Sequence, residues 1–66
     1  MVVRRVDTGE FWGGEEGWVS NPIWEAEHFF RLEDARAIIQ VLSADCKILD
    51  FLTIGTHIHA RDYDRL

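Results

Sequence analysis

The run 13-GGEEG-17 constrains this chain more than any other stretch, because one tryptophan comes directly before it and another directly after it. Three glycines around two carboxylates suit a tight connection with positive φ angles, which other residues rarely adopt. The flanking pairs, Phe11-Trp12 and Trp18-Val19, are aromatic or β-branched and are typical of strands. The segment therefore predicts a β-hairpin in which Trp12 and Trp18 approach each other across the strands.

From Glu33 onward the apolar residues follow a helical spacing. The apolar positions at i, i+3, i+4 and i+7 are Ala35, Ile38, Ile39 and Leu42. Glu33 and Asp34 would lie in the first turn, where carboxylates complement the positive end of the helix dipole. The pattern predicts an amphipathic helix of about three turns that ends near residues 43–45. Since a helix this short is not stable alone, it must pack on a sheet.

Two further segments, residues 2–7 and 46–54, are rich in β-branched and apolar residues. The second is apolar on both faces, which suits a central strand covered on each side or a strand whose second face meets another subunit. Gly55-Thr56 suits either a turn into a final strand over 57–63 or a bulge within one long strand. Residues 23–29 fit a short extended segment by their alternation, or the start of a helix by their composition.

A chain of 66 residues forms one domain at most, residues 1–66. Its predicted fold class is α+β: a small antiparallel sheet, made of the N-terminal aromatic hairpin and one or two C-terminal strands, with one amphipathic helix packed on it. A domain this small hides only about 60% of its unfolded surface. Three Trp and four Phe exceed what one such core is expected to hide. Surplus apolar surface on a small domain typically binds a partner, often a second copy of the same chain.

The sequence therefore predicts a non-catalytic domain for protein–protein interaction, either a homo-oligomer or a chain that binds another protein. Trp24, two residues after Pro22, is the tryptophan expected at the interface, together with Phe51 and Ile58 in the C-terminal part. Unpaired strand edges would add to this surface. No enzymatic activity is expected, because no nucleophile, base and orienting group stand at a recognisable spacing.

The charge pattern limits the kinds of partner. Seven basic residues are scattered among twelve acidic ones, and the net charge is −5. Binding to nucleic acid or to an anionic membrane is therefore not expected. The single cysteine, Cys46, and the lack of a leader or long apolar run indicate a cytoplasmic protein. The acidity also allows a further alternative, an acidic mimic of nucleic acid that inhibits a DNA-binding protein, which would need its carboxylates in a strip along one face.

His57 and His59 form the one pattern that points to metal chemistry. Residues i and i+2 of a strand share a face, so both imidazoles could reach one divalent transition metal. Further ligands would be needed, and none stands at a recognised spacing. The candidates are His28, Cys46, Asp50 and Asp62. The sequence thus predicts no cofactor, and a small metal-binding or metal-sensing protein is the alternative function.

Residues 10–36 carry an ordered set of features. These are Phe11-Trp12, a turn, Gly17-Trp18-Val19, and then Ala26 and Phe29 or Phe30 before Glu33-Asp34-Ala35. The order resembles short uncharacterised bacterial and phage-type proteins, in which an aromatic pair, a turn, Gly-Trp-Val and Ala-x-x-Phe lead into a helix. The chain departs from them by inserting residues 21–24 in place of a short polar link. The resemblance implies a ββα packing unit, with no known activity and no catalytic residues, and it does not extend to the C-terminal strand or His-Ile-His.

Overall fold

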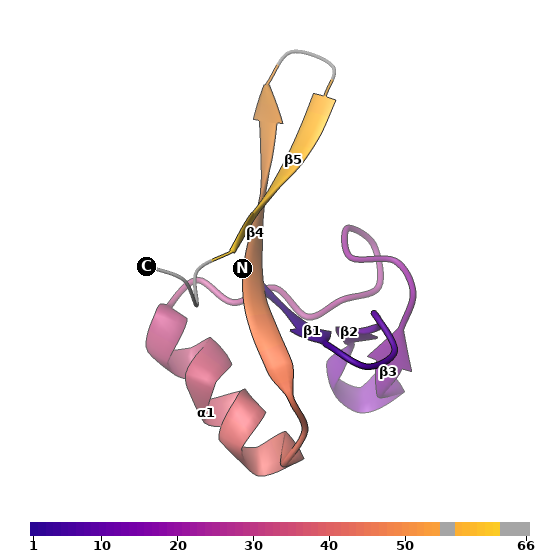
Figure 1. Ribbon diagram of the computed structural model, residues 1–66, viewed down its shortest axis with the longest axis vertical. Helices are drawn as coiled ribbons and strands as arrows, with labels where there is room; N and C mark the ends of the chain where they lie inside the picture. The colour runs from indigo at the N-terminus through magenta and orange to yellow at the C-terminus, as the bar shows by residue number, and fades with distance from the viewer. Residues whose placement is uncertain (55–56, 63–66) are drawn as a thin grey trace.

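The computed structural model describes the backbone of residues 1–54 and 57–62, and the side chains of residues 1–50. Its elements are β1 (Val2–Arg5), β2 (Phe11–Trp12), the short 3-10 helix η1 (Gly14–Glu16), β3 (Trp18–Val19), α1 (Leu32–Leu42), β4 (Cys46–Ile54) and β5 (His57–Asp62). The strands form one antiparallel sheet in the order β3-β2-β1-β4-β5, and α1 lies beside β4 (Figure 1). The predicted α+β fold class, with an aromatic hairpin, one helix and one or two C-terminal strands, is confirmed, and the C-terminal strands are two.

The β2–β3 hairpin forms as the glycine-rich run predicts. Trp12 pairs with Trp18 in the register, and their rings meet edge to face, with centroids 5.6 Å apart and planes at 70°. The Gly13 N–H donates to the Gly17 carbonyl over 2.7 Å and closes the turn. Gly17 has φ 75°, a left-handed backbone angle that favours glycine. Glycine at this position therefore lets two strands of only two residues each come together.

Helix α1 packs its apolar stripe on one face of the sheet. Ala35 is fully buried against Val3, Cys46 and Ile48, and Leu42 is half-buried beside them. Two acidic side chains lie in the first turn, as the sequence predicts. The helix ends at Ser43, whose φ of 52° is left-handed and stops the hydrogen-bond ladder. The helix begins one residue before the predicted Glu33, and its last residue is Leu42, just before the predicted 43–45.

The central strands β1 and β4 are covered on both faces. On the α1 side lie Val3 and Ile48, and on the other side Val2 and Leu49 pack against Phe11, Val19 and Ala26. Alternate residues of a strand face opposite sides, so each strand contributes to both clusters. The expectation that the strand over residues 46–54 is covered on both faces is correct for its first half, residues 46–49.

The connecting segment, residues 20–31, differs from both alternatives predicted for residues 23–29. It is a turn at its start: the Asn21 side-chain oxygen accepts from the N–H groups of Ile23 (2.9 Å) and Trp24 (3.1 Å), and the Asn21 carbonyl accepts from Ala26 (3.1 Å). An Asn side chain that binds the backbone two and three residues on favours a turn over a strand. Further along, the Phe29 N–H donates to the Met1 carbonyl over 2.7 Å. The extended prediction is thus wrong for residues 23–25, while Phe29 pairs with Met1 much as a strand residue would.

Beyond Leu49 the sheet narrows to two strands. β1 pairs with β4 from Cys46 to Leu49, and β5 pairs with β4 from Leu49 to Ile54. Residues 50–54 and 57–61 thus form a two-stranded extension, the β4–β5 ribbon, which projects away from α1 and β1–β3 (Figure 1). Since β5 runs antiparallel to β4, the alternative of one long bulged strand is excluded. In the described part of the chain no helix has the length and apolar character to cross a membrane.

Candidate functional site

The connecting segment displays two large aromatic side chains to solvent. Trp24 is 85% exposed and Phe30 is 98% exposed. Both are carried by a backbone that is attached to the core on either side, because Ala26 is buried beside Val2 and Phe29 is hydrogen-bonded to Met1. Aromatic side chains held outward on an attached backbone offer a partner apolar surface without a large ordering cost. They are the strongest candidates for a binding site in the described part of the chain; by the Trp24/Phe30 surface we mean these two exposed side chains, six residues apart, and no contact between them.

The other two tryptophans serve the fold. Trp12 and Trp18 are half-buried, and both pack against the cluster under α1. The Arg5 guanidinium lies 5.3 Å from the Trp18 ring centre, and its Nε atom forms a 2.7 Å ion pair with Asp7. The Trp12 indole N–H is buried and has no hydrogen-bond partner among the described residues. The expectation that Trp24 is the exposed tryptophan is therefore correct, while its place in an interface stays a prediction.

Phe30 is the exposed residue that the sequence reasoning missed. The doublet Phe29-Phe30 was a usable signal, because neighbouring residues of an extended backbone point to opposite sides and only one of them can face the core. Phe29 takes the inner position, where it packs against the cluster under α1. Phe30 consequently faces solvent just before Leu32 begins the helix.

The other predicted interface residues, Phe51 and Ile58, belong to the β4–β5 ribbon. In the register Phe51 pairs with Ala60 and Thr53 with Ile58. Directly paired residues share a face of the sheet, so Phe51 and Ile58 occupy the same face of the ribbon. Their side chains lie outside the described residues, and their contact with a partner stays a prediction.

The predicted metal ligands His57 and His59 lie in β5, paired with Ile54 and Leu52. Their side chains also lie outside the described residues. The register nevertheless limits which other residues could join them. Cys46 is six residues from Leu52 along β4, which separates it from His59 by about 20 Å at the strand rise of about 3.3 Å per residue. Asp62 occupies the opposite face of β5, because the face alternates along a strand.

The two remaining candidate ligands already have partners near the N-terminus of β1. His28 Nε2 lies 3.1 Å from the Ile23 carbonyl oxygen, and an Asp50 carboxylate oxygen lies 3.9 Å from the Met1 amine. The register puts Asp50 on the same face of the ribbon as both histidines, and no cluster of metal-binding side chains is found among residues 1–50.

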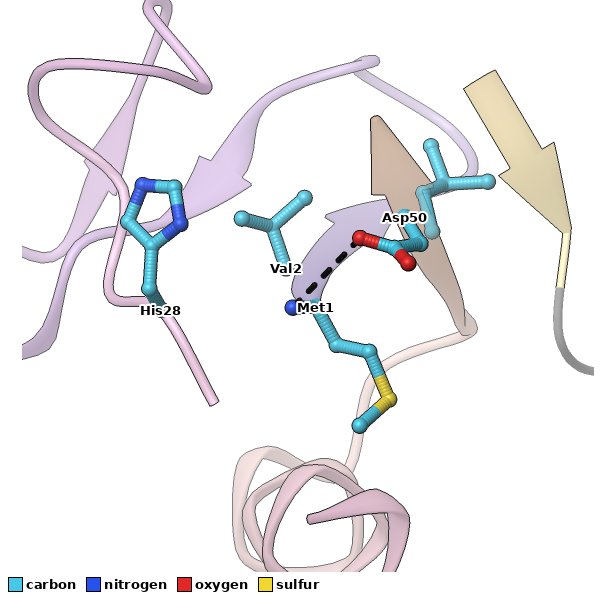
Figure 2. A pocket seen from close by; sticks show the side chains of 5 residues that line it. Met1, Val2, His28 and Asp50 are labelled. Carbon is cyan, nitrogen blue, oxygen red and sulfur yellow. Dashed lines mark ion pairs between the residues drawn. The ribbon is translucent and has the colours of Figure 1, made fainter. Parts of the chain in front are cut away.

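A small pocket lies between β1, β4 and the connecting segment (Figure 2). It has a volume of about 60 Å³ and is lined by Met1, Val2, His28, Leu49 and Asp50. Figure 2 shows the Met1 amine directed at the Asp50 carboxylate, with His28 beyond Val2. Pockets that enclose small molecules have volumes of roughly 300–1,000 Å³, whereas this one suits a few water molecules. We therefore do not place substrate chemistry here.

Five of the exposed carboxylates fall into two separate groups. Glu27 lies beside the glycine-rich turn: its carboxylate oxygen is 3.0 Å from the position that a Cβ atom on Gly14 would occupy. Glu15 and Glu16 belong to the same turn, so these three carboxylates form one group. A second group, residues 33–34, lies in the first turn of α1, on the opposite side of the molecule in Figure 1. These groups hold five of the twelve acidic residues of the chain, so the alternative of a nucleic-acid mimic, which would need one continuous strip, stays a prediction.

No family model, no curated protein and no solved structure matches the chain. The resemblance of residues 10–36 to short phage-type proteins accordingly stays a prediction. Function must be inferred from the geometry of the chain itself.

Proposed function

We propose that this chain is a small non-catalytic domain that associates with other protein chains, beginning with a second copy of itself. The observation that carries the proposal is the exposure of Trp24, at 85%, on a hydrogen-bonded turn that is attached to the core. Phe30, at 98%, belongs to the same connecting segment. Tryptophan is enriched among the few residues that dominate binding energy in interfaces, where its apolar ring and single N–H donor are both useful.

The energetics of Trp24 favour a role in association over a role in folding. Of roughly 250 Å² for a tryptophan side chain, folding covers only the small unexposed part, which at about 25 cal/mol per Å² stabilises the fold by about 1 kcal/mol or less. Covering most of the remaining area in an interface is worth several times as much, before the costs of association. Removing the indole should therefore weaken binding far more than it weakens the fold.

Sedimentation velocity over a concentration series tests the proposal. We expect concentration-dependent dimers for the wild-type chain, and a dissociation constant raised by about 30-fold or more in Trp24→Ala, which corresponds to the roughly 2 kcal/mol of a hot-spot residue. The matched control is Val41→Ala, which removes another apolar side chain that is 78% exposed, here on α1. It should leave the dissociation constant nearly unchanged.

The same samples separate the competing explanations. Urea unfolding should give Trp24→Ala a stability close to that of the wild type, whereas a large loss would assign the side chain to the core. Self-association would be refuted if the wild-type chain stayed monomeric up to about 1 mM. The binding free energy would then be weaker than about −4 kcal/mol. Equal weakening by Val41→Ala would show that the effect is not specific to the Trp24/Phe30 surface.

A further inference from the structure

The negative charge of the chain is concentrated in the part that carries the Trp24/Phe30 surface. Residues 6–30 contain six acidic residues and no lysine or arginine, whereas the rest of the chain contains six acidic and seven basic residues. The two parts therefore have net charges of −6 and +1, which together give the −5 of the whole chain. A segment with charge of a single sign produces a negative field, and such a field attracts positively charged partners.

Two of these carboxylates belong to the backbone that carries the exposed aromatics. Glu25 follows Trp24 directly in the turn at Asn21, where its N–H donates to the Asn21 carbonyl over 3.2 Å. Glu27 is three residues from both Trp24 and Phe30. Since consecutive Cα atoms are 3.8 Å apart, the Glu27 Cα atom lies within about 11 Å of either aromatic Cα atom. Both glutamates are exposed, so a partner that covers Trp24 meets them at the rim of the contact.

The hairpin turn extends this negative surface. The Glu27 N–H donates to the Trp12 carbonyl over 2.8 Å, which holds the connecting segment against β2. The Glu27 carboxylate consequently lies beside the turn that carries Glu15 and Glu16. Figure 1 shows the connecting segment and η1 on the same side of the molecule, away from α1.

No cation of the described residues offsets these charges. The exposed glutamates at positions 15, 16, 25 and 27 form no ion pair with a described residue. The arginines that flank residues 6–30 pair with other carboxylates. Arg5 forms its 2.7 Å ion pair with Asp7, and the Arg31 guanidinium lies 3.8 Å from the Glu33 carboxylate. Trp24 thus stands beside negative charge that remains available to a partner.

This combination indicates the chemistry of the partner. An exposed indole is best covered by an apolar recess, and glutamates at the rim favour lysine or arginine opposite them. Phosphate groups or carboxylates at the same place would be repelled. A second copy that met the surface with its own identical surface would bring like charges together, whereas a basic partner would not.

We propose that the Trp24/Phe30 surface binds a protein partner with an apolar recess bordered by lysine or arginine side chains. The inference rests on the proposed role of this surface in association and names the chemistry of the partner. The apolar ring supplies most of the affinity, while the surrounding glutamates select the partner and speed its approach.

Selection from a random peptide library tests the proposal without assuming a partner. Short random peptides displayed on phage are selected on the immobilised full chain in about 0.15 M NaCl, where charges are screened beyond about 8 Å. Clones that bind the Trp24→Ala variant are removed first. We expect the enriched peptides to combine apolar residues with a net positive charge that the unselected library does not have.

Titration calorimetry of one selected peptide then separates local charge from net charge. Glu25→Gln combined with Glu27→Gln should weaken binding about fivefold, the effect of losing two exposed ion pairs. The matched control is Asp34→Asn combined with Asp45→Asn, which removes two exposed carboxylates from α1 and from the turn that follows it. It changes the net charge equally and should alter the affinity less than about twofold, because charges beyond the screening length contribute little. Circular dichroism checks that each variant keeps the wild-type fold.

Three results would overturn the proposal. Enriched peptides that are neutral or acidic would show that the surface does not select a basic partner, and so would the absence of any enriched peptide after the removal step. Equal weakening by the control variant would show that only the net charge of the chain matters. Failure here is distinguishable from failure of the proposed function, because self-association and its weakening by Trp24→Ala are measured without any peptide.

Discussion

The contact between Trp12 and Trp18 should be the main side-chain interaction that holds the β2–β3 hairpin. Each of these strands has two residues, so the backbone ladder alone is short. The test is a double-mutant cycle with Trp12→Leu, Trp18→Leu and the two changes combined. Leucine keeps an apolar side chain at each position and removes the edge-to-face contact.

The structure sets the expected magnitudes. Edge-to-face aromatic pairs with centroids 4.5–7 Å apart contribute about 0.5–1.5 kcal/mol beyond the area they bury, and this pair is at 5.6 Å and 70°. The cycle should therefore give a coupling of about 1 kcal/mol. Arg5 lies 5.3 Å from the Trp18 ring only, so Trp18→Leu should cost about 0.5–1 kcal/mol more than Trp12→Leu. The loss of the Arg5 contact lowers the stability of Trp18→Leu and of the double variant by the same amount, so it cancels from the coupling energy.

Urea unfolding followed by far-ultraviolet circular dichroism measures all four free energies. A chain of this length is expected to unfold with a total of roughly 3–10 kcal/mol, so a coupling of about 1 kcal/mol is a measurable share. Trp18→Leu combined with Trp24→Leu is the control cycle, since Trp24 is 85% exposed and the two changes should add within about 0.5 kcal/mol. Additivity within the same limit for Trp12 and Trp18 would refute the role assigned to their contact.

Two further changes test the hairpin turn and the core beneath α1. Gly13→Ala should destabilise the chain by about 1–3 kcal/mol. The added Cβ would lie 2.9 Å from a Val19 methyl carbon and 3.0 Å from the Gly17 carbonyl oxygen. An unchanged melting temperature would contradict this and show that Val19 repacks. Burial raises the pKa of the Cys46 thiol above its ordinary 9.0, so the unfolded chain loses this proton first and the free energy of unfolding should fall as pH rises above about 9. Urea titrations from pH 7 upward should show this fall in the wild type and a smaller one in Cys46→Ala; parallel curves would contradict it.

The local parts of the fold could be predicted from the sequence because their causes are local. Glycines between two tryptophans indicated the hairpin, and the apolar spacing after Glu33 indicated α1. The turn at Asn21 had a local signal too, since Asn commonly binds the backbone two residues on. The alternation through Trp24 and Ala26 suggested a strand instead, and the hydrogen bonds of Asn21 prevailed over it.

The order of the strands could not be predicted in the same way. The sequence of β4 is apolar on both faces. This pattern does not predict that β1 pairs with only the first four residues of β4. Which strands lie side by side depends on contacts between residues far apart in the chain, such as Val2 with Leu49. For the same reason, the separation of Cys46 from the histidines became visible only in the register of β4 with β5.

The exposed aromatics and the open edge support association for different physical reasons. Trp24 contributes little to the stability of the fold at its observed exposure, so its large apolar ring favours a partner surface. β5 has β4 beside it and no second neighbour among the described strands, and its sequence lacks the lysine or proline that commonly protects edges. Association through the aromatics would depend on burial of apolar area, and association through the edge on backbone hydrogen bonds.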